Sequence, residues 1–297
     1  MSGSGDAGRG GRITLVATPI GNLGDISERA RSALATAERI ACEDTRRTGK
    51  LLERLGISRP RLVRMDDHTE RAVAGSLVKA ASRGEEIVVV TDAGTPGLSD
   101  PGAAVVAAAI DAGIALEVVP GPFAGAAAAV LSGLLDGAGR FTFEGFLPRK
   151  GKARAERLTQ VGGSRVPVVL YEAPNRVVAT VDDLIGACGP QRRVALSREL
   201  TKLHEQTWRG TLEAAGEYLG ENPPRGEFVI TVGAAPAPPE ASDEQIAAAL
   251  GRHLGSGASA RDAAAEVAGS LGVAPNRVKR IANSLGTAAD EPSDSER

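Results

Sequence analysis

Short runs of β-branched residues alternate with alanine-rich stretches along the first 120 residues of the chain. Short β-branched runs favour strands, and longer stretches with apolar residues every three or four positions favour helices. The clearest strand lies at 87–91, where an almost unbroken apolar run is typical of a parallel sheet covered on both faces. The alternation predicts an α/β fold. Further elements are expected as strands at 13–17, 39–42 and 115–119 and as helices at 45–55, 70–82 and 103–112.

The same alternation resumes after a glycine- and alanine-rich helix expected at 123–135. Here a segment at 205–209 is expected to pair with 228–232 as an antiparallel section of the sheet. Because one domain usually holds roughly 100 to 200 residues, a chain of 297 residues predicts two α/β domains, at 12–121 and 122–234. The strands of the second domain are expected at 141–146, 166–171, 193–197 and 227–232.

A different pattern begins after the second domain. Residues 235–241 are rich in proline and alanine and are expected to form a linker. Residues 242–286 read as a helical tail domain, with a break at Leu271-Gly272-Val273 that gives a helix-turn-helix-like spacing. The glycine- and serine-rich start at 1–11 and the polar end at 287–297 are expected to be disordered.

Composition narrows the class of protein. A formal charge of −2 provides no overall field that would attract a polyanion, so any contact with nucleic acid requires a local patch. Cys42 and Cys188 lie far apart without a nearby Cys/His pattern, which disfavours disulfides and structural zinc and fits the cytoplasm. The three histidines form no HExxH or HxH pair, so no catalytic metal is expected. The longest apolar run, at 124–135, is too short for a membrane span.

The loop at 91–97 follows the strongest predicted strand, where open α/β sheets place their ligand crevice. Gly94 and Gly97 allow a ligand to approach the backbone, and Asp92 can accept a hydrogen bond from an amine or hydroxyl. An ordinary loop with a capping aspartate explains these residues equally well. A matching turn at 120–122 ends the next strand and favours a binding site. Neither loop carries the GxGxxG pattern, so a dinucleotide site is disfavoured.

Two further segments combine acids and cations. Glu43 and Asp44 follow the strand at 39–42, where they can bind hydroxyls or accept a proton, although Asp44 can equally cap the following helix. The segment 198–205 reads Arg-Glu-Leu-Thr-Lys-Leu-His-Glu, a density of charge that suits either an active site or an exposed loop of ion pairs.

Five cations gather within nine residues just after a predicted strand, at Arg149, Lys150, Lys152, Arg154 and Arg157. They suit a phosphate-binding loop, or simply a solvated helix start. Residues 171–176 also end a predicted strand, and there an aromatic ring can stack on a base or on adenine.

Taken in order, these segments resemble the ribosomal RNA small subunit methyltransferase I family, the cytidine 2′-O-methyltransferase branch of the tetrapyrrole methylase superfamily. The resemblance runs from about residue 13 to about residue 233 and departs at 65–70, where a second His and an Asn are expected beside His68. Its most specific blocks are 16–25, 41–46, 92–102, 145–150 and 198–205.

The resemblance implies a two-domain tetrapyrrole-methylase-like fold with S-adenosylmethionine in a cleft between the α/β domains, and a homodimer. The substrate it implies is small-subunit (16S) ribosomal RNA. The implied cofactor-binding residues are Pro19, Asp92, Ala93, Gly94, Thr95, Asp100, Pro120, Gly121, Tyr171 and Glu172. We expect RNA contacts at the cations Arg149, Lys150, Lys152, Arg154, Arg176 and Arg198.

The chemistry of the reactants defines which steps of the reaction the enzyme has to assist. A sulfonium methyl group is already electrophilic, so the attacking ribose oxygen has to be aligned and its proton removed. The candidate bases are Lys202, Asp44, Glu199 and His204. Lys202 is preferred, because burial beside Arg198 is expected to depress the pKa of its ammonium; an exposed ion pair with Glu199 or Glu205 is the alternative.

Two other functions compete with RNA methylation. One is methylation of a tetrapyrrole or another small molecule by a protein of the same superfamily. The other is a ligand-sensing regulator that reads DNA with residues 259–285, although that segment offers few cations for the purpose, Arg277, Lys279 and Arg280.

Overall fold

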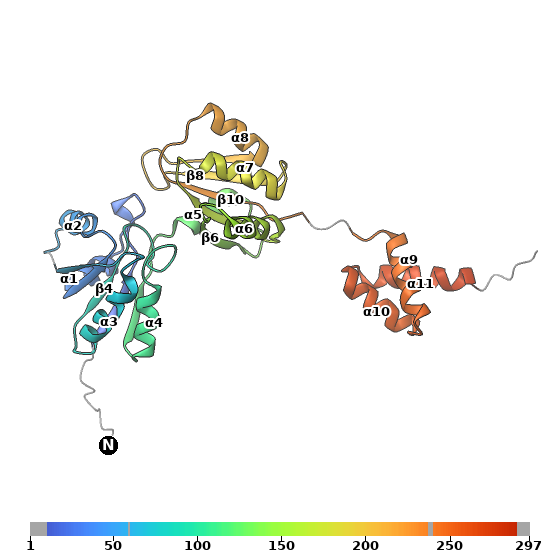
Figure 1. Ribbon diagram of the computed structural model, residues 1–297, viewed down its shortest axis with the longest axis horizontal. Helices are drawn as coiled ribbons and strands as arrows, with labels where there is room; N and C mark the ends of the chain where they lie inside the picture. The colour runs from blue at the N-terminus through green and yellow to red at the C-terminus, as the bar shows by residue number, and fades with distance from the viewer. Residues whose placement is uncertain (1–10, 59, 237–239, 290–297) are drawn as a thin grey trace, which may run out of the picture. The chain divides into compact units, whose positions relative to one another are not determined.

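The computed structural model describes residues 11–58, 60–236 and 240–289 (Figure 1). The chain divides into two compact units, Met1–Ala235 and Pro236–Arg297. In the described part of the first unit, the strands form two five-stranded sheets. The predicted domain bounds 12–121 and 122–234 stay a prediction, supported by the fact that each sheet takes its strands from one of these ranges.

The first sheet has the strand order β3-β2-β4-β1-β5, and every neighbouring pair is parallel. Side chains of successive strand residues point to opposite faces, so Ile87 and Val89 pack under α3 and α4 whereas Val88 and Val90 pack under α1 and α2. Both faces are therefore covered, as the apolar run predicted. The elements are β1 (Arg12–Val16), α1 (Glu28–Thr36), β2 (Arg39–Cys42), α2 (Thr45–Arg54), β3 (Arg61–Arg64), α3 (Glu70–Ala81), β4 (Ile87–Val89), α4 (Ala103–Asp111) and β5 (Ala115–Val119).

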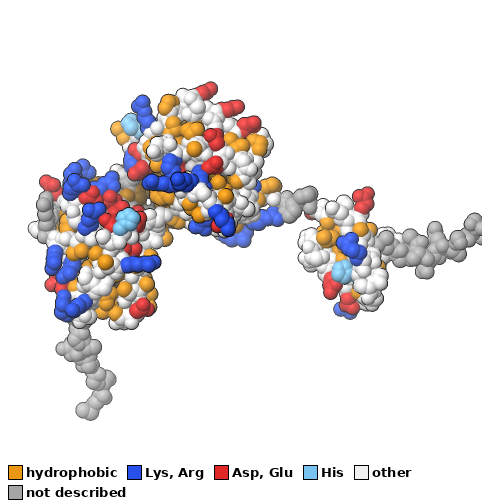
Figure 2. Space-filling model, in the orientation of Figure 1, with side chains coloured by type: hydrophobic (Ala, Val, Ile, Leu, Met, Phe, Trp, Pro, Cys, Tyr) orange, Lys and Arg blue, Asp and Glu red, His pale blue; other side chains and the backbone are white. Residues whose placement is uncertain are grey.

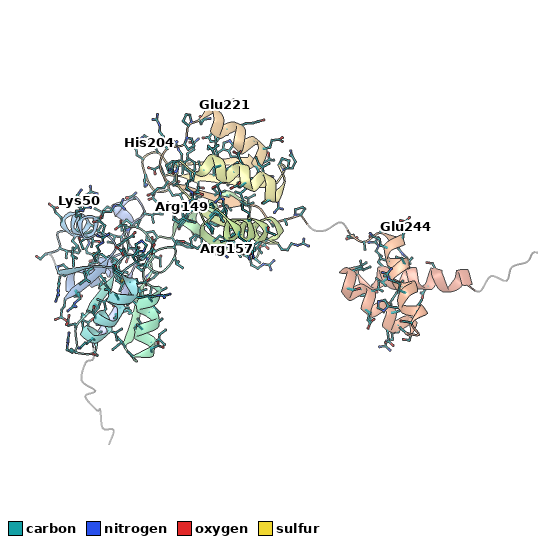
Figure 3. The ribbon with its side chains drawn as sticks, viewed as in Figure 1. Lys50, Arg149, Arg157, His204, Glu221 and Glu244 are labelled. Atoms are coloured by element: carbon teal, nitrogen blue, oxygen red, sulfur yellow. The ribbon has the colours of Figure 1, made fainter. Side chains whose placement is uncertain are left out.

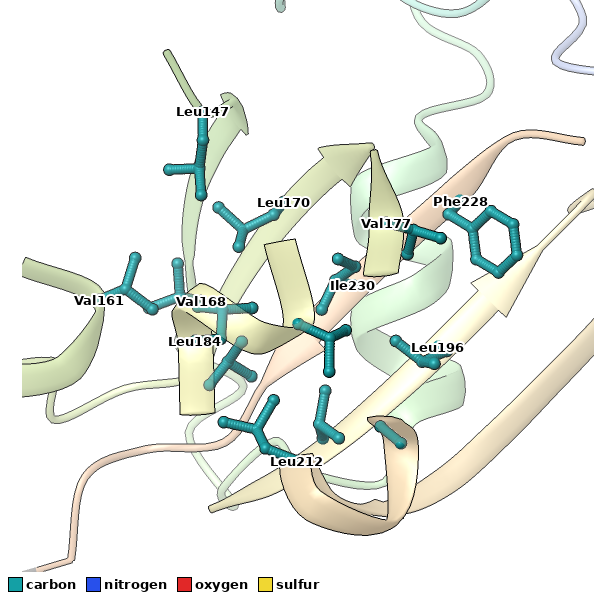
Figure 4. Packing of buried hydrophobic residues seen from close by; sticks show 14 of the residues in the cluster. Leu147, Val161, Val168, Leu170, Val177, Leu184, Leu196, Leu212, Phe228 and Ile230 are labelled. Carbon is teal, nitrogen blue, oxygen red and sulfur yellow. The ribbon is translucent and has the colours of Figure 1, made fainter. Parts of the chain in front are cut away.

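The second sheet has the order β6-β7-β10-β8-β9 and is antiparallel except for the β6–β7 pair. Helix α5 covers one face through Ala128 and Ala129, and α6, α7 and α8 cover the other around Leu170, Leu196 and Ile230 (Figure 4). The elements are α5 (Ala124–Ser132), β6 (Thr142–Phe146), α6 (Lys152–Gly163), β7 (Val168–Glu172), α7 (Val177–Cys188), β8 (Arg193–Arg198), β9 (Gln206–Thr211), α8 (Leu212–Glu221) and β10 (Phe228–Val232).

The predicted pairing of 205–209 with 228–232 is wrong. Strand β8 lies between β9 and β10 and pairs antiparallel with both. The physical reason is that β8 and β9 follow each other across a short connection, and strands joined in this way usually become neighbours.

The described residues of the C-terminal unit form three helices, α9 (Asp243–Gly255), α10 (Ala260–Leu271) and α11 (Pro275–Ala289), around a small apolar core. The predicted break is confirmed, because Gly272 ends α10 in the left-handed conformation with φ +62°. A second break precedes Ser259, which caps α10. Helix α11 continues to Ala289, so the predicted disorder over 287–289 is wrong. The other residues predicted to be disordered, apart from Gly11, lie outside the described residues.

Candidate active site

Three loops meet at the carboxyl ends of β1, β4 and β5. The backbones of Thr18 and Gly94 exchange two hydrogen bonds of 2.9 and 3.0 Å, which join the first loop to the second. Thr95 Oγ1 donates to the carbonyl of Pro122 at 3.2 Å, which joins the second loop to the third. Gly94 has φ +84°, a conformation that favours glycine. The segments predicted at 91–97 and 120–122 therefore form one connected surface.

A cavity of about 340 Å³ lies between these loops and the second sheet. Six of the ten predicted cofactor residues line it: Ala93, Gly94, Thr95, Asp100, Tyr171 and Glu172. The other four, Pro19, Asp92, Pro120 and Gly121, are not part of its wall. Gly121 instead packs on Ala17, where a Cβ atom would lie 2.9 Å from the alanine side chain.

Aromatic rings form the apolar wall of the cavity. Tyr171 packs edge to face against Phe143 and Phe146, with ring centroids 4.9 and 5.6 Å apart. Its hydroxyl accepts a hydrogen bond from the amide of Gly125 at 3.1 Å, which fixes the ring. Burial raises the pKa of Tyr171 to about 12, so the phenol stays neutral. Sequence reasoning missed Phe146, although an aromatic residue at the end of a strand was an available signal.

Asp100 is the carboxyl group at the cavity whose pKa is most perturbed. Burial, followed by the charges of Glu43, Asp67 and Asp92, raises the pKa of Asp100 to about 7. Burial likewise raises the pKa of Glu43. A cationic group of a ligand would relieve this repulsion and favour the ionised form of Asp100.

Asp44 and Asp92 hold the start of α2. The Asp44 carboxylate accepts hydrogen bonds from the amides of Arg46 and Arg47 at 2.8 and 3.3 Å, which confirms it as a helix cap. The Arg46 amide is the main reason that the pKa of Asp44 is lowered. Asp92 accepts from the Asp44 amide at 3.2 Å and from Arg47 Nη1 at 2.7 Å, so both of its oxygens bind within the protein.

Lys202 lies between two carboxylates. Its Nζ donates to Glu199 Oε1 and to Glu227 Oε2, both at 2.9 Å. Partial burial opposes the charged form, but the bonds to Glu227 and Glu199 outweigh burial and raise the pKa of Lys202 above its ordinary value. The predicted depression of that pKa is therefore wrong. His204 is exposed in the same connection between β8 and β9.

The predicted RNA-binding cations divide into two groups. The side chains of Arg149, Lys150 and Lys152 are exposed, and Figure 2 shows cationic side chains on the face that carries Arg149 in Figure 3. In contrast, Arg154 is 11% exposed and binds Asp183 at 2.7 Å. Arg176 pairs with the buried carboxylate of Glu172 at 3.2 Å, and within the described residues the half-buried Arg198 leaves its Nε without a hydrogen bond.

Among the described residues, no group of three or more His, Cys, Asp or Glu side chains is arranged to hold a metal ion. Likewise, no described helix is long and apolar enough to cross a membrane. In the C-terminal unit, Arg277 is bound by Glu240 and Asp243 at 2.9 and 2.6 Å, so this cation is already paired within the unit.

The family model for tetrapyrrole (corrin/porphyrin) methylases matches residues 12–216. A Synechocystis protein named ribosomal RNA small subunit methyltransferase I is 45% identical over 238 residues, which are 80% of this chain and 84% of that protein. The chain belongs to this methyltransferase family. A relative of the same name from Mycobacterium tuberculosis H37Rv is 42% identical over 87% of this chain and 89% of its own.

Solved structures support the fold that family membership implies. The methyltransferase CobJ gives a TM-score of 0.58 with 21% identity, over 76% of this chain and 95% of its own. Uroporphyrin-III C-methyltransferase from Thermus thermophilus, in complex with S-adenosylhomocysteine, gives 0.53 with 21% identity over 75% and 97%. The predicted two-domain tetrapyrrole-methylase-like fold is thus confirmed.

Proposed function

We propose that this chain transfers a methyl group from S-adenosylmethionine to the 2′-hydroxyl of a cytidine in small-subunit ribosomal RNA, in the cytoplasm. The observation that carries the proposal is the 45% identity to the Synechocystis ribosomal RNA methyltransferase over most of both chains. The cavity bounded by loops of one sheet and strands of the other supports the proposal further.

The residues of the cavity fit the cofactor. Phe146 and Tyr171 offer an apolar wall on which an adenine can pack. The backbone of residues 93–95 offers polar groups at the sheet edge, and Asp100 provides a carboxyl group suited to an amine or a sulfonium. When bound there, S-adenosylmethionine supplies an electrophilic methyl group. These residues bind and orient it, since the methyl group needs no further activation.

Lys202, Glu199, Asp44 and His204 remain the candidates for handling the acceptor hydroxyl. Asp44 is engaged as a helix cap, and Lys202 is held protonated by two carboxylates. We infer that Lys202 orients the hydroxyl as a hydrogen-bond donor, because an ammonium has three N–H groups and the described residues accept from two of them. Glu199 then serves to position Lys202.

RNA contact is assigned to the exposed cations Arg149, Lys150 and Lys152. Such side chains are free to bind phosphates without losing a partner deep in the protein. Arg154 and Arg176 instead hold the segment before α6 in place, because they donate to the carbonyls of Pro148 and Leu147. Both groups support one RNA-binding surface, the first by contact and the second by shaping it.

A homodimer is part of the proposal. Ile110 and Val118 are 64% and 56% exposed although both are large and apolar, and β5, which carries Val118, is an edge strand of the first sheet. Exposed apolar residues along an edge favour association with another surface. A second copy of this chain is the partner that we assign to them.

The function is tested by mapping ribose methylation on small-subunit RNA from cells with and without this protein. One cytidine is expected to lose its 2′-O-methyl group when the protein is absent and to regain it when purified protein and S-adenosylmethionine are added to the subunits. A tetrapyrrole, offered as acceptor in parallel, is expected to remain unmethylated. An unchanged map, or transfer to the tetrapyrrole alone, contradicts the proposal.

A further inference from the structure

Glu227 is the acidic residue at the cavity that sequence reasoning did not select. It comes immediately before β10, and its backbone accepts a hydrogen bond from the Glu199 amide at 3.0 Å. Its own amide donates to Glu199 Oε1 at 2.9 Å. The two glutamates therefore stand side by side where β8 ends and β10 begins, although 28 residues separate them along the chain.

The backbone around this pair is held in an unusual conformation. Glu199 and Thr201 have φ +50° and +65°, values that residues with a side chain rarely adopt. Gly226 packs so closely that a Cβ atom there would lie 2.5 Å from the Glu199 carboxylate, and it has φ +77°. Strained conformations of this kind gather at functional sites, where the surrounding structure maintains them.

The loop also meets the first sheet's side of the cavity. A Cβ atom on Gly21 would lie 2.4 Å from Lys202 Cγ, so the loop after β1 packs directly on the lysine stem. The pKa of Arg47 is raised first by its bond to Asp92, and the charge of Glu227 adds to the effect. The negative charge of Glu227 therefore acts on Arg47 of α2, although the bond that Arg47 makes is to Asp92.

Glu199 and Glu227 differ in exposure. The Glu199 side chain is 22% exposed and binds Lys202 and the Glu227 amide, whereas the Glu227 side chain is 77% exposed and lines the cavity. Lys202 binds Oε2 of Glu227, and no other hydrogen bond to the Glu227 carboxylate is found within the described residues. Its Oε1 is therefore free to accept a proton from a bound molecule.

We propose that Glu227 is the base that takes the proton of the acceptor hydroxyl, while Lys202, fixed by Glu199, orients that hydroxyl. This inference rests on the proposed function. The O–H bond breaks and its proton moves to Glu227 Oε1, while the oxygen forms a bond to the methyl group. The electron pair of the broken carbon–sulfur bond stays on the sulfur, which becomes a neutral thioether. The exposed Glu227 carboxyl then releases its proton to water.

The test compares single-turnover methyl transfer to small ribosomal subunits that lack the modification. Glu227→Gln keeps an acceptor for Lys202 but takes no proton at neutral pH, so its rate is expected to fall about a hundredfold or more. Its affinity for S-adenosylmethionine, measured by calorimetry, is expected to stay within about twofold, since the base acts on the acceptor. Glu221→Gln, an exposed carboxylate at the end of α8, is the matched control and keeps the wild-type rate.

Two further measurements separate a base from a residue that merely positions Lys202. Because Glu227 is exposed, added formate is expected to restore part of the rate to Glu227→Ala. In the cofactor-free protein, the pKa of Lys202 followed by NMR is expected to fall in Glu227→Gln, since one carboxylate partner is lost.

The outcomes distinguish this inference from the proposed function. A wild-type rate in Glu227→Gln overturns the inference, as does a slow Glu227→Ala enzyme that formate does not accelerate. Wild-type protein that transfers no methyl group to the subunits overturns the proposed function instead, and the NMR measurement on Lys202 still tests the geometry.

Discussion

At the scale of single residues, Asp100 is the carboxyl group of the cavity whose pKa is most strongly raised. Burial and three neighbouring carboxylates raise its pKa to about 7, far above the value of the same group in an unfolded chain. Between those two pKa values the unfolded chain is ionised while the native protein keeps the proton. The free energy of unfolding contributed by Asp100 therefore falls as the pH rises from about 4 to about 7, and it is constant above that range.

Asp100→Asn removes this pH dependence. We expect the variant to be more stable than the wild type at pH 8, by about 1–3 kcal/mol after allowance for the partial exposure of the carboxyl group. The difference is expected to vanish below about pH 4. Denaturant unfolding of both proteins at a series of pH values measures it. A stability difference that is the same at pH 4 and pH 8 contradicts the assigned cause.

The same substitution is expected to weaken S-adenosylmethionine binding, because the amide cannot neutralise a cationic group. A loss of roughly tenfold or more in affinity corresponds to one charge-assisted hydrogen bond. Calorimetry at pH 8 is the measurement. Asp111→Asn, which changes an exposed carboxylate at the end of α4, is the matched control and is expected to leave affinity unchanged.

At the scale of elements, the local sequence pattern predicted the bounds of single strands but not how the strands pair. The strands at 39–42 and 115–119 match β2 and β5 residue for residue, because a short apolar run between polar turns defines each one. The order of β8, β9 and β10 was not predictable in this way, since it depends on which strands pair across the sheet. The contacts of Glu70 were not predictable from local pattern either. Its carboxylate accepts hydrogen bonds from the amides of Gly102 and Ala104 at the start of α4, both at 2.7 Å.

The candidate site follows the same division. The loops at 91–97 and 120–122 were predictable, because strand ends of one parallel sheet meet at one edge. Lys202 was recognised from the charge density of 198–205, but its pKa was predicted in the wrong direction, because Glu227 lies 25 residues away in the sequence. No local pattern shows that contact.

The exposed cations just before and at the start of α6 give a prediction at the scale of elements. Replacing Arg149, Lys150 and Lys152 together by Gln is expected to weaken binding to small ribosomal subunits and to reduce its salt dependence, because fewer counterions are released. Affinity for S-adenosylmethionine is expected to remain, since none of the three lines the cavity. Binding measured at several salt concentrations tests this. A salt slope equal to that of the wild type excludes the patch.

A matched control distinguishes contact from structure. Arg154→Gln removes a cation that already binds Asp183 and the carbonyl of Pro148. We expect it to lower the free energy of unfolding rather than the salt slope, because a partly buried pair loses one partner. The reverse result, a normal stability with a reduced slope, would mean that Arg154 also contacts RNA.

At the scale of the whole molecule, the edge of the first sheet is the feature that a single copy leaves unexplained. Leu116 and Val118 belong to β5, and each is at least 36% exposed. Ile13 pairs with Leu116 and Leu15 pairs with Val118 in register. These four side chains therefore point to the same face of the sheet. The apolar face of the sheet thus continues to an open edge, which favours burial against a second copy.

Val118→Asp tests this arrangement, because it places a charge in the centre of the proposed contact, where desolvation makes it costly. Wild-type protein is expected to have twice the 30.4 kDa mass of the chain in light scattering, and the variant is expected to be a monomer at the same micromolar concentration. Val178→Asp, on the outside of α7, is the matched control and should remain dimeric, since Val178 is 40% exposed on the other sheet's helices. A wild-type mass equal to that of one chain excludes the dimer. A Val118→Asp variant that remains dimeric shows that the interface does not include Val118.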